Sequence, residues 1–422
     1  MIFFERILGM KEFDLLIDLG TTTIASVLYD FSHEKCTASD LSLNPQRICG
    51  TDVISRMQAS LAGSADELAH MIREHLATRI TLLCDQAGVF ADHIRRIRIG
   101  GNTTMIYLFM GYSCESLSKS PFVPDEPVPE GGIFDIESGE FLFGEKADDK
   151  VFFSPDDPNS FTEVEIIPWS SAFIGGDIVS GLIWVSDEFS DDRTVLFIDL
   201  GTNGEMVLSH GGKMYAAATA AGPAFEGGGL SCGTGAIPGA ISGVKLYPSR
   251  PALTTIENRL PIGICGSGAI SIVSELMDKG YVNPDASLSP GFPEGGLVLT
   301  PHAATPEKSP IIFNADDLHS VLLAKAAVAA GIDTLMKAAM ISATDVDRVI
   351  LSGSFGNNID LKACEKIHLF SDIPVSVVEC AGNSCLNGLM KLSALNEIKM
   401  PKLHDINLGK SDYFKKMYLK RI

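Results

Sequence analysis

Two copies of one short pattern, about 180 residues apart, constrain this chain more than any other feature. The first is Asp18-Leu19-Gly20-Thr21-Thr22-Thr23 after the mainly apolar run 14–17, and the second is Asp199-Leu200-Gly201-Thr202-Asn203-Gly204 after the apolar run 195–198. Each pattern predicts a buried strand that ends in Asp, a tight Gly turn with polar residues, and a second strand, over 24–29 and 205–208. The chain therefore contains two hairpins of the same construction.

Such a turn has the chemistry of a phosphate site. A glycine lets the backbone approach phosphate oxygens, amides and hydroxyls donate to them, and a carboxylate on the preceding strand can hold the metal that neutralises a polyphosphate. Neither turn is a P-loop, because no Gly-Lys-Ser/Thr follows. One copy is weak evidence, since strands often end in Asp-Gly turns. Two copies at the spacing of domains favour a nucleotide site.

With both hairpins the chain resembles the actin-like ATPase superfamily, which includes sugar kinases, heat-shock ATPases and actin. A third superfamily element also matches: the string 348–357 is an apolar strand followed by a Gly-rich turn. The resemblance implies an α/β, two-lobed actin-like ATPase (ribonuclease H-like) fold with a nucleotide cleft between the lobes. It also implies that Gly353, Ser354, Phe355 and Gly356 lie against the adenosine; an ordinary strand-to-helix connection is the alternative.

Length and composition limit the function classes. At 422 residues, with 45% hydrophobic residues and 40 glycines, the chain is expected to be a globular α/β protein of at least two domains. The net charge of −20 argues against nucleic-acid binding, because such binders present a basic face. Only residues 399–422 turn basic, and we expect them to form a solvated tail rather than a docking arm.

The N-terminus and the cysteines indicate a cytoplasmic protein that does not enter a membrane. Glu5 and Arg6 interrupt the first apolar stretch, so neither a signal peptide nor a membrane span is expected. The nine cysteines show no Cys-x-x-Cys spacing, so no zinc site or iron-sulfur cluster is predicted in this chain. Unpaired thiols suit a reducing compartment.

The pattern of elements predicts how the chain is divided. We expect a first lobe over 12–190 with an acidic insertion at about 121–164, a second lobe over 191–378, a C-terminal helix over 379–398 that returns to the first lobe, and the basic tail. Amphipathic or apolar periodicity predicts long helices over 65–87 and 315–339, and Asp52 is expected to cap a shorter helix that starts at Val53.

Three further places carry candidate site residues. Asp177 follows two glycines and opens an apolar helix, which in the superfamily can present a carboxylate near the γ-phosphate; helix capping is the alternative. The Gly-rich segment 222–235 predicts a phosphate-facing loop that contains Glu226, Gly227 and Gly228, with a flexible linker as the alternative. For Asn102 and Thr103, capping of the following helix and a direct nucleotide or substrate contact are equally compatible with the sequence.

A set of strings covers nearly the whole chain, from about residue 14 to 395. The strings are 18–23, 44–46, 101–105, 175–177, 201–205, 221–228, 265–268 and 356–357. Together they resemble the ATPase domain of the reductive activators of corrinoid enzymes. The resemblance implies ATP-dependent return of inactive cobalt(II) to cobalt(I), with a corrinoid protein or methyltransferase as partner. A homodimer is implied by analogy alone.

The chain departs from that family in one respect. Such activators usually carry an iron-sulfur domain of their own, whereas here the ATPase pattern begins within fourteen residues of Met1 and no cysteine follows Cys385. We therefore expect a separate ferredoxin-like protein to supply the electron.

The resulting hypothesis assigns a role to each candidate. Asp18 and Asp199 organise Mg²⁺ and the attacking water, and Asp177, Glu205 or Glu226 orients that water. The alternative for Glu205 is a residue on the strand surface, and the alternative for Glu226 is a carboxylate at a helix start. The residues expected to hold ATP in the two turns and the Gly-rich loop are Gly20, Thr21, Thr22, Thr23, Gly201, Thr202, Asn203, Gly204, Gly227 and Gly228.

Two other function classes remain open at this point. A small-molecule kinase of the same fold predicts ATP turnover that depends on a metabolite. An ATP-sensing scaffold predicts tight binding with almost no turnover.

Overall fold

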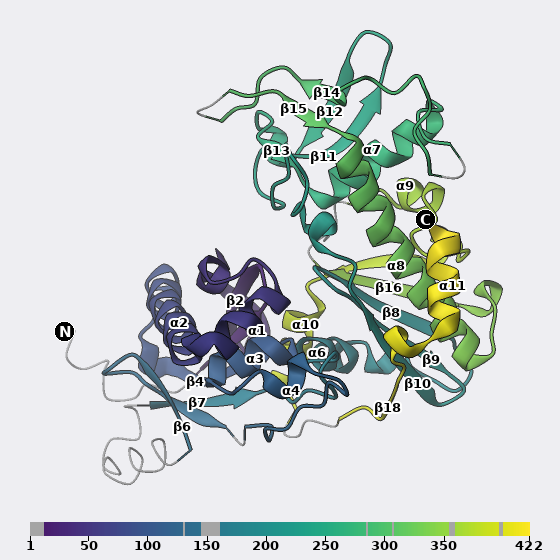
Figure 1. Ribbon diagram of the computed structural model, residues 1–422. Coiled ribbons are helices and arrows are strands. Elements are labelled where there is room, and N and C mark those ends of the chain that lie inside the picture. The colour runs from purple at the N-terminus through teal and green to yellow at the C-terminus, as the bar shows by residue number, and fades with distance from the viewer. Residues whose placement is uncertain are drawn as a thin grey trace. The chain divides into compact units, whose positions relative to one another are not determined.

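The computed structural model describes residues 12–129, 131–144, 161–283, 286–305, 308–353, 359–395 and 400–422 (Figure 1). The chain forms two compact units. Unit 1 consists of the chain up to Ser186 together with Ser384–Pro401, and unit 2 consists of Asp187–Asn383 and Lys402–Ile422.

Unit 1 is built on a seven-stranded mixed sheet with the order β3-β2-β1-β4-β7-β5-β6. β1 pairs with β2 antiparallel and with β4 parallel, and β4 continues parallel to β7. The acidic segment expected as an insertion contributes the hairpin β5–β6 to this sheet. The strands are β1 Phe13–Leu19, β2 Thr23–Asp30, β3 Lys35–Leu43, β4 Ile94–Gly101, β5 Gly132–Asp135, β6 Glu140–Phe143 and β7 Phe161–Ile166.

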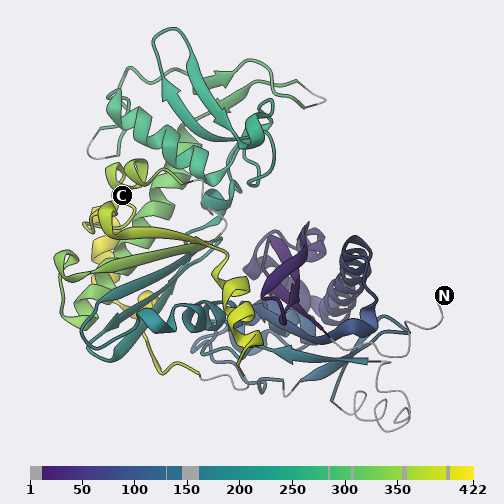
Figure 2. The same cartoon turned by 180° about the vertical axis from the view of Figure 1, so that it is seen from behind.

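Helices cover both faces of this sheet, as the alternation of side chains along β1 requires. Leu15, Ile17 and Leu19 join the core on the face covered by α2 and α3. Leu16 packs on the opposite face with α6 and α10, which lie against each other (Figure 2). The helices are α1 Val53–Ala59, α2 Ala65–Ala87, α3 Thr103–Met110, α4 Glu115–Ser118, α6 Gly176–Trp184 and α10 Ser384–Ser393, with a π-helical turn at Ser60–Ser64.

Unit 2 contains a six-stranded sheet with the order β17-β16-β8-β9-β10-β18 and two small sheets, β12-β11-β13 and β14-β15. The strands are β8 Val195–Leu200, β9 Gly204–His210, β10 Lys213–Thr219, β11 Ala240–Leu246, β12 Pro251–Thr255, β13 Gly263–Ile264, β14 Leu297–Thr300, β15 Ile311–Phe313, β16 Arg348–Gly353, β17 Val378–Gly382 and β18 Leu403–Asp405. The helices are α7 Gly266–Asp278, α8 Ala315–Ala339, α9 Leu361–Lys366 and α11 Asp412–Arg421.

Short 3-10 helices connect many of these elements. They are Pro45–Ile48, Ala91–His93, Ser186–Glu188, Pro223–Glu226, Ile256–Asn258, Ala343–Asp345, Val375–Val377 and Leu408–Lys410.

The two large sheets share one five-strand pattern. In unit 1 an antiparallel meander β3-β2-β1 continues through the parallel strands β4 and β7. In unit 2 the meander β10-β9-β8 continues through the parallel strands β16 and β17. The duplication seen in the sequence is therefore a duplication of architecture.

Helix predictions are confirmed where the apolar pattern is long. α2 and α8 have the expected bounds, and Asp52 caps α1 by accepting from the Ser55 amide. Among the described residues α8 alone is long and apolar enough to cross a membrane, and 83% of its most apolar window is buried. It is the central core helix of unit 2.

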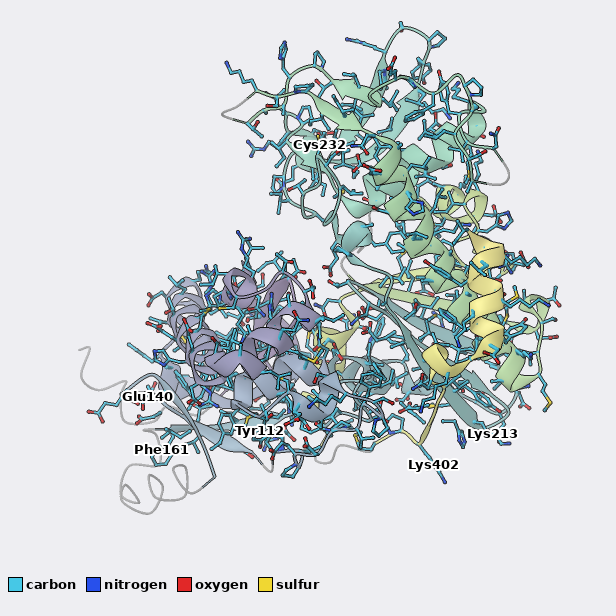
Figure 3. All side chains as sticks on the ribbon, viewed as in Figure 1. Tyr112, Glu140, Phe161, Lys213, Cys232 and Lys402 are labelled. Atoms are coloured by element: carbon cyan, nitrogen blue, oxygen red, sulfur yellow. The ribbon has the colours of Figure 1, made fainter. Side chains whose placement is uncertain are left out.

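The basic C-terminal segment was expected to be solvated, and the structure corrects this. β18 pairs in parallel with β10, so that Lys213 and Lys402 lie at adjoining strand ends (Figure 3). α11 packs along α8, and the Arg421 guanidinium donates to the buried carboxylate of Asp333. The sequence does not reveal this contact, because Arg421 pairs with Asp333 and Asp372, which only the tertiary structure brings close to it.

A buried ion-pair cluster fixes the beginning of β1 in unit 1. Asp14 is fully buried and accepts two hydrogen bonds from Arg95, at 2.9 and 2.7 Å. Arg98 is 2% exposed, lies 3.7 Å from Asp14 and donates to Glu165 at 2.6 Å. Arg98 Nη1 also donates to Ser393 Oγ at 3.3 Å, which ties the end of α10 to the sheet.

This cluster predicts a large stability difference between two carboxyl-to-amide changes on the same sheet. Asp14→Asn removes the charge that compensates two arginines, so we expect the unfolding free energy to fall by about 3 kcal/mol. Glu163→Gln removes a largely exposed partner of Arg96 and should change stability little. Urea unfolding of both variants measures this, and equal losses would contradict the structural role of Asp14.

Candidate functional site

The first turn lies where β1, β2 and β4 end together. Asp18 pairs in register with Ala25 on β2 and with Gly100 on β4. Because side chains alternate along a strand, Asp18 shares the face of Leu16, the face that α6 and α10 cover. A Cβ on Gly20 would lie 2.4 Å from the Thr23 carbonyl oxygen, so the turn requires glycine.

Two asparagines support this first turn. Asn44, fully buried at the end of β3, donates through Nδ2 to the Gly20 carbonyl at 2.9 Å, and its backbone amide donates to the Thr22 carbonyl at 3.0 Å. Asn102 caps α3 by accepting from the Met105 amide at 2.9 Å and donates through Nδ2 to Thr21 Oγ1 at 3.0 Å. For Asn102 the capping interpretation is confirmed, and the same side chain also holds the turn.

A buried arginine lies close to the residues that support the first turn. Arg56 of α1 donates through Nη1 to the Met105 sulfur at 3.3 Å, and Asn44 Nδ2 lies 3.8 Å from the same sulfur. Burial lowers the pKa of Arg56 to about 10, so the guanidinium stays protonated at neutral pH. The polar support of the first turn therefore extends into the core between α1 and α3.

Asp177 lies in the first turn of α6, beside Asn102. A Cβ on Gly175, the N-cap residue, would lie 2.8 Å from Asp177 Oδ1 and 2.5 Å from the Asn102 Cα. Asp177 Oδ1 accepts from the amide of Ile178 at 2.8 Å. Unit 1 thus gathers Thr21, Asn102 and Asp177 in one neighbourhood, at the edge where β1 and β4 end.

The second turn is covered by a carboxylate from the Gly-rich segment. Thr202 Oγ1 donates to Glu226 Oε2 at 2.6 Å, and a Cβ on Gly201 would lie 3.0 Å from Glu226 Oε1. Within the turn the Gly201 amide donates to the Asn203 carbonyl at 2.8 Å, and Gly204 begins β9. Glu226 ends the 3-10 helix Pro223–Glu226, which rejects the flexible-linker alternative for this part of the segment.

Gly227 and Gly228 shape the loop that carries Glu226. Gly227 is left-handed, with φ 76°, and a Cβ there would lie 2.0 Å from the Thr234 carbonyl oxygen. A Cβ on Gly228 would lie 2.7 Å from Pro223 Cβ. The shortest of these contacts are with their own segment, and their predicted contact with ATP stays a prediction.

Two carboxylates lie opposite each other beside the second turn. Asp199 on β8 pairs in register with Glu205 on β9, so both side chains lie on the same face of the sheet, and Glu205 is 9% exposed. Mg²⁺ is usually bound by one or two carboxylates together with substrate phosphates and water. The two side chains are chemically suited to such an ion.

Ser352 is a site residue that the sequence analysis missed. It pairs in register with Asp199, is 2% exposed, and directs Oγ to Asp199 Oδ2 at 2.9 Å and to the Gly382 carbonyl at 3.1 Å. The sequence feature that could have identified Ser352 is a hydroxyl residue directly before Gly353 in the string 348–357.

The structure describes the string 348–357 only as far as Gly353. This glycine has φ 113°, and a Cβ would lie 2.1 Å from the Leu200 carbonyl oxygen, so β16 ends in close contact with β8. The predicted adenosine residues Ser354, Phe355 and Gly356 lie outside the described residues.

The cysteines near the Gly-rich segment have structural contacts. Cys265 is 1% exposed, precedes α7 and approaches the Ile241 carbonyl at 3.2 Å. Cys232 Sγ accepts from the Ile312 amide at 3.4 Å (labelled in Figure 3). Within the described ranges no group of three or more His, Cys, Asp or Glu side chains is placed to hold a metal ion.

A family model described as the C-terminal domain of RACo, the ASKHA domain, matches residues 193–422. The chain belongs to this RACo family. A second model, the RACo middle region, matches residues 13–131. The predicted family and the actin-like α/β fold are confirmed, and an ASKHA domain implies a nucleotide site.

Individual relatives agree with this assignment. The chain is similar to the corrinoid activation enzyme RamQ of Eubacterium limosum, with 30% identity over 396 residues that cover 89% of this chain and 63% of RamQ. It is also similar to the [Co(II) methylated amine-specific corrinoid protein] reductase of Methanosarcina barkeri, with 23% identity over 383 residues, 84% of this chain and 65% of the relative.

One solved structure has a similar backbone fold. A reductive activator for corrinoid, iron-sulfur protein superposes with a TM-score of 0.82 at 30% identity, over 96% of this chain and 65% of that one. The chain thus spans slightly less than two thirds of the length of each of these three relatives.

The Ser352 contact predicts a stability effect. Ser352→Ala removes a buried hydrogen bond to a carboxylate, and we expect the unfolding free energy to fall by about 2 kcal/mol. Ser242→Ala removes a long hydrogen bond of 3.4 Å to the Thr254 carbonyl and serves as the matched control, with little change expected. Urea unfolding distinguishes them; no loss in Ser352→Ala would contradict its role in holding Asp199.

Proposed function

We propose that this chain binds and hydrolyses ATP and couples hydrolysis to the reductive reactivation of a cobalt(II) corrinoid protein. The observation that carries the ATPase part is the duplicated turn, each copy following an aspartate at the end of a buried strand that also has a parallel neighbour. The corrinoid partner is supported by the relatives, whose names describe activation or reduction of corrinoid proteins.

The proposed roles follow from what each turn can offer. The first turn would hold phosphate oxygens through the hydroxyls and backbone amides of Thr21 and Thr22. The second turn would do so through the backbone amides of Thr202 and Asn203 and the side-chain amide of Asn203, because the Thr202 hydroxyl is bonded to Glu226. Bound Mg²⁺ would neutralise the developing charge on the phosphates. In unit 2, Asp199, held by Ser352, would hold that ion directly or through water, and Glu205 adds a second carboxylate beside Asp199. Asp18 is the corresponding carboxylate of unit 1.

The proposed overall reaction conserves atoms and electrons. ATP and water give ADP and phosphate, and one electron passes from a low-potential, ferredoxin-like donor to cobalt(II), which becomes cobalt(I). For a one-electron step, about 59 mV of unfavourable potential corresponds to a tenfold change in the equilibrium. Hydrolysis can therefore support a transfer that the donor alone does poorly.

Partner-dependent ATP hydrolysis tests this proposal. We expect a cobalt(II) corrinoid protein to stimulate hydrolysis by the purified chain. Asp199→Asn should lower kcat about 100-fold or more, because it removes a charge that organises the reacting groups. A rate unaffected by a panel of such proteins but raised by a metabolite would overturn the proposal and indicate a small-molecule kinase. Tight ATP binding with no turnover would indicate a scaffold.

Three amide variants identify the carboxylate that orients water. Asp177 lies beside Asn102, whereas Glu226 is held by Thr202, so we expect Asp177→Asn to lower kcat about 100-fold with little change in KM. Glu226→Gln should mainly raise KM because it loosens the second turn. Glu205→Gln should shift the Mg²⁺ dependence.

An exposed acid provides the control for this series. Glu257→Gln, on the small sheet region of unit 2, should leave both kinetic constants unchanged. A kcat loss in Glu226→Gln with normal Asp177→Asn would reverse the assignment.

A further inference from the structure

The first turn differs from the second in how its threonine hydroxyl is bonded. Asn102 accepts the Met105 amide through Oδ1, so its Nδ2 must be the atom that faces Thr21. Thr21 Oγ1 therefore accepts a hydrogen bond, at 3.0 Å, from a group that can only donate. The single hydroxyl hydrogen of Thr21 is left to donate in another direction.

Thr202 shows the opposite arrangement in the second turn. Its hydroxyl donates to Glu226 Oε2 at 2.6 Å, and an ionised carboxylate can only accept hydrogen bonds. While this bond stands, the Thr202 hydrogen is not available to a phosphate oxygen. The two threonines occupy equivalent positions in the duplicated pattern but offer different groups to a ligand.

Asn44 also donates hydrogen bonds to acceptors of the first turn. Its side-chain amide and its backbone amide donate to the carbonyls of Gly20 and Thr22, on either side of Thr21. Three acceptors of the turn are thus bonded to amide donors from two other segments. Because these acceptors already have donors, the turn offers mainly hydrogen-bond donors to a ligand. It therefore suits a ligand group that only accepts hydrogen bonds, such as a phosphate oxygen.

We propose that Asn102 is a positioning residue that, by donating to Thr21, directs the Thr21 hydroxyl hydrogen to a phosphate oxygen of bound ATP. The inference rests on the proposed function in one respect, namely that the first turn meets the phosphates. It goes further by assigning a role to Asn102, which acts through Thr21 and does not itself touch the ligand.

A double-mutant cycle tests this assignment. Asn102→Ser keeps a side chain that can cap α3 but removes the amide donor, and Thr21→Val removes the hydroxyl while keeping the shape. We expect Thr21→Val to raise the Kd for MgATP about tenfold, the effect of one hydrogen bond to a charged acceptor, and Asn102→Ser to raise it about threefold or more. The double variant should match Thr21→Val within about twofold.

The outcomes separate this inference from the function on which it rests. Multiplicative losses in the double variant, or an unchanged Kd in Asn102→Ser, would overturn the role of Asn102. Failure of the wild-type chain to bind ATP would instead overturn the proposed function.

Two controls guard against a folding artefact. Asn407→Ser changes another asparagine cap, whose side chain accepts from Lys410, and should leave the Kd unchanged. Melting temperatures identify any variant that is misfolded, and Asn102→Thr, another capping residue without the amide, replaces Asn102→Ser if that variant does not fold. The same coupling to Thr21→Val is expected for it.

Discussion

The parallel pairing of β1 with β4 in unit 1, and of β8 with β16 in unit 2, determines where the functional side chains gather. Parallel neighbours end at a common edge, so the residue opposite each strand-end aspartate is fixed by register. Opposite Asp18 this residue is Gly100, and opposite Asp199 it is Ser352. The turn that follows each aspartate is consequently surrounded by groups from segments that are distant in sequence.

The two units use this common framework differently. In unit 1, amides of Asn44 and Asn102 bond the acceptors of the turn, and the acidic group nearby is Asp177 at the start of α6. In unit 2, carboxylates dominate: Asp199 and Glu205 share one face, and Glu226 holds the Thr202 hydroxyl. The first turn is therefore better suited to direct contact with phosphate, and the second to a cation and water.

Much of this arrangement could be predicted from the sequence because its signals are local. Both hairpins, α2, α8 and the Asp52 cap follow from periodicity and neighbouring residues. Ser352 and Asn44 could not be assigned roles, because their partners are set by strand register and by a contact between the ends of β3 and β1. The packing of α11 was mispredicted for the same reason, because its residue Arg421 bonds to Asp333, 88 positions earlier in the chain.

The most direct test of the account is cobalt reduction itself, followed through the EPR signal of the cobalt(II) corrinoid protein in the presence of a low-potential iron-sulfur donor. We expect the signal to disappear when the chain and ATP are both present, and to persist when a non-hydrolysable ATP analogue replaces ATP. Equal loss of the signal with the analogue, or without the chain, would contradict the claim that ATP hydrolysis by this protein drives the reduction.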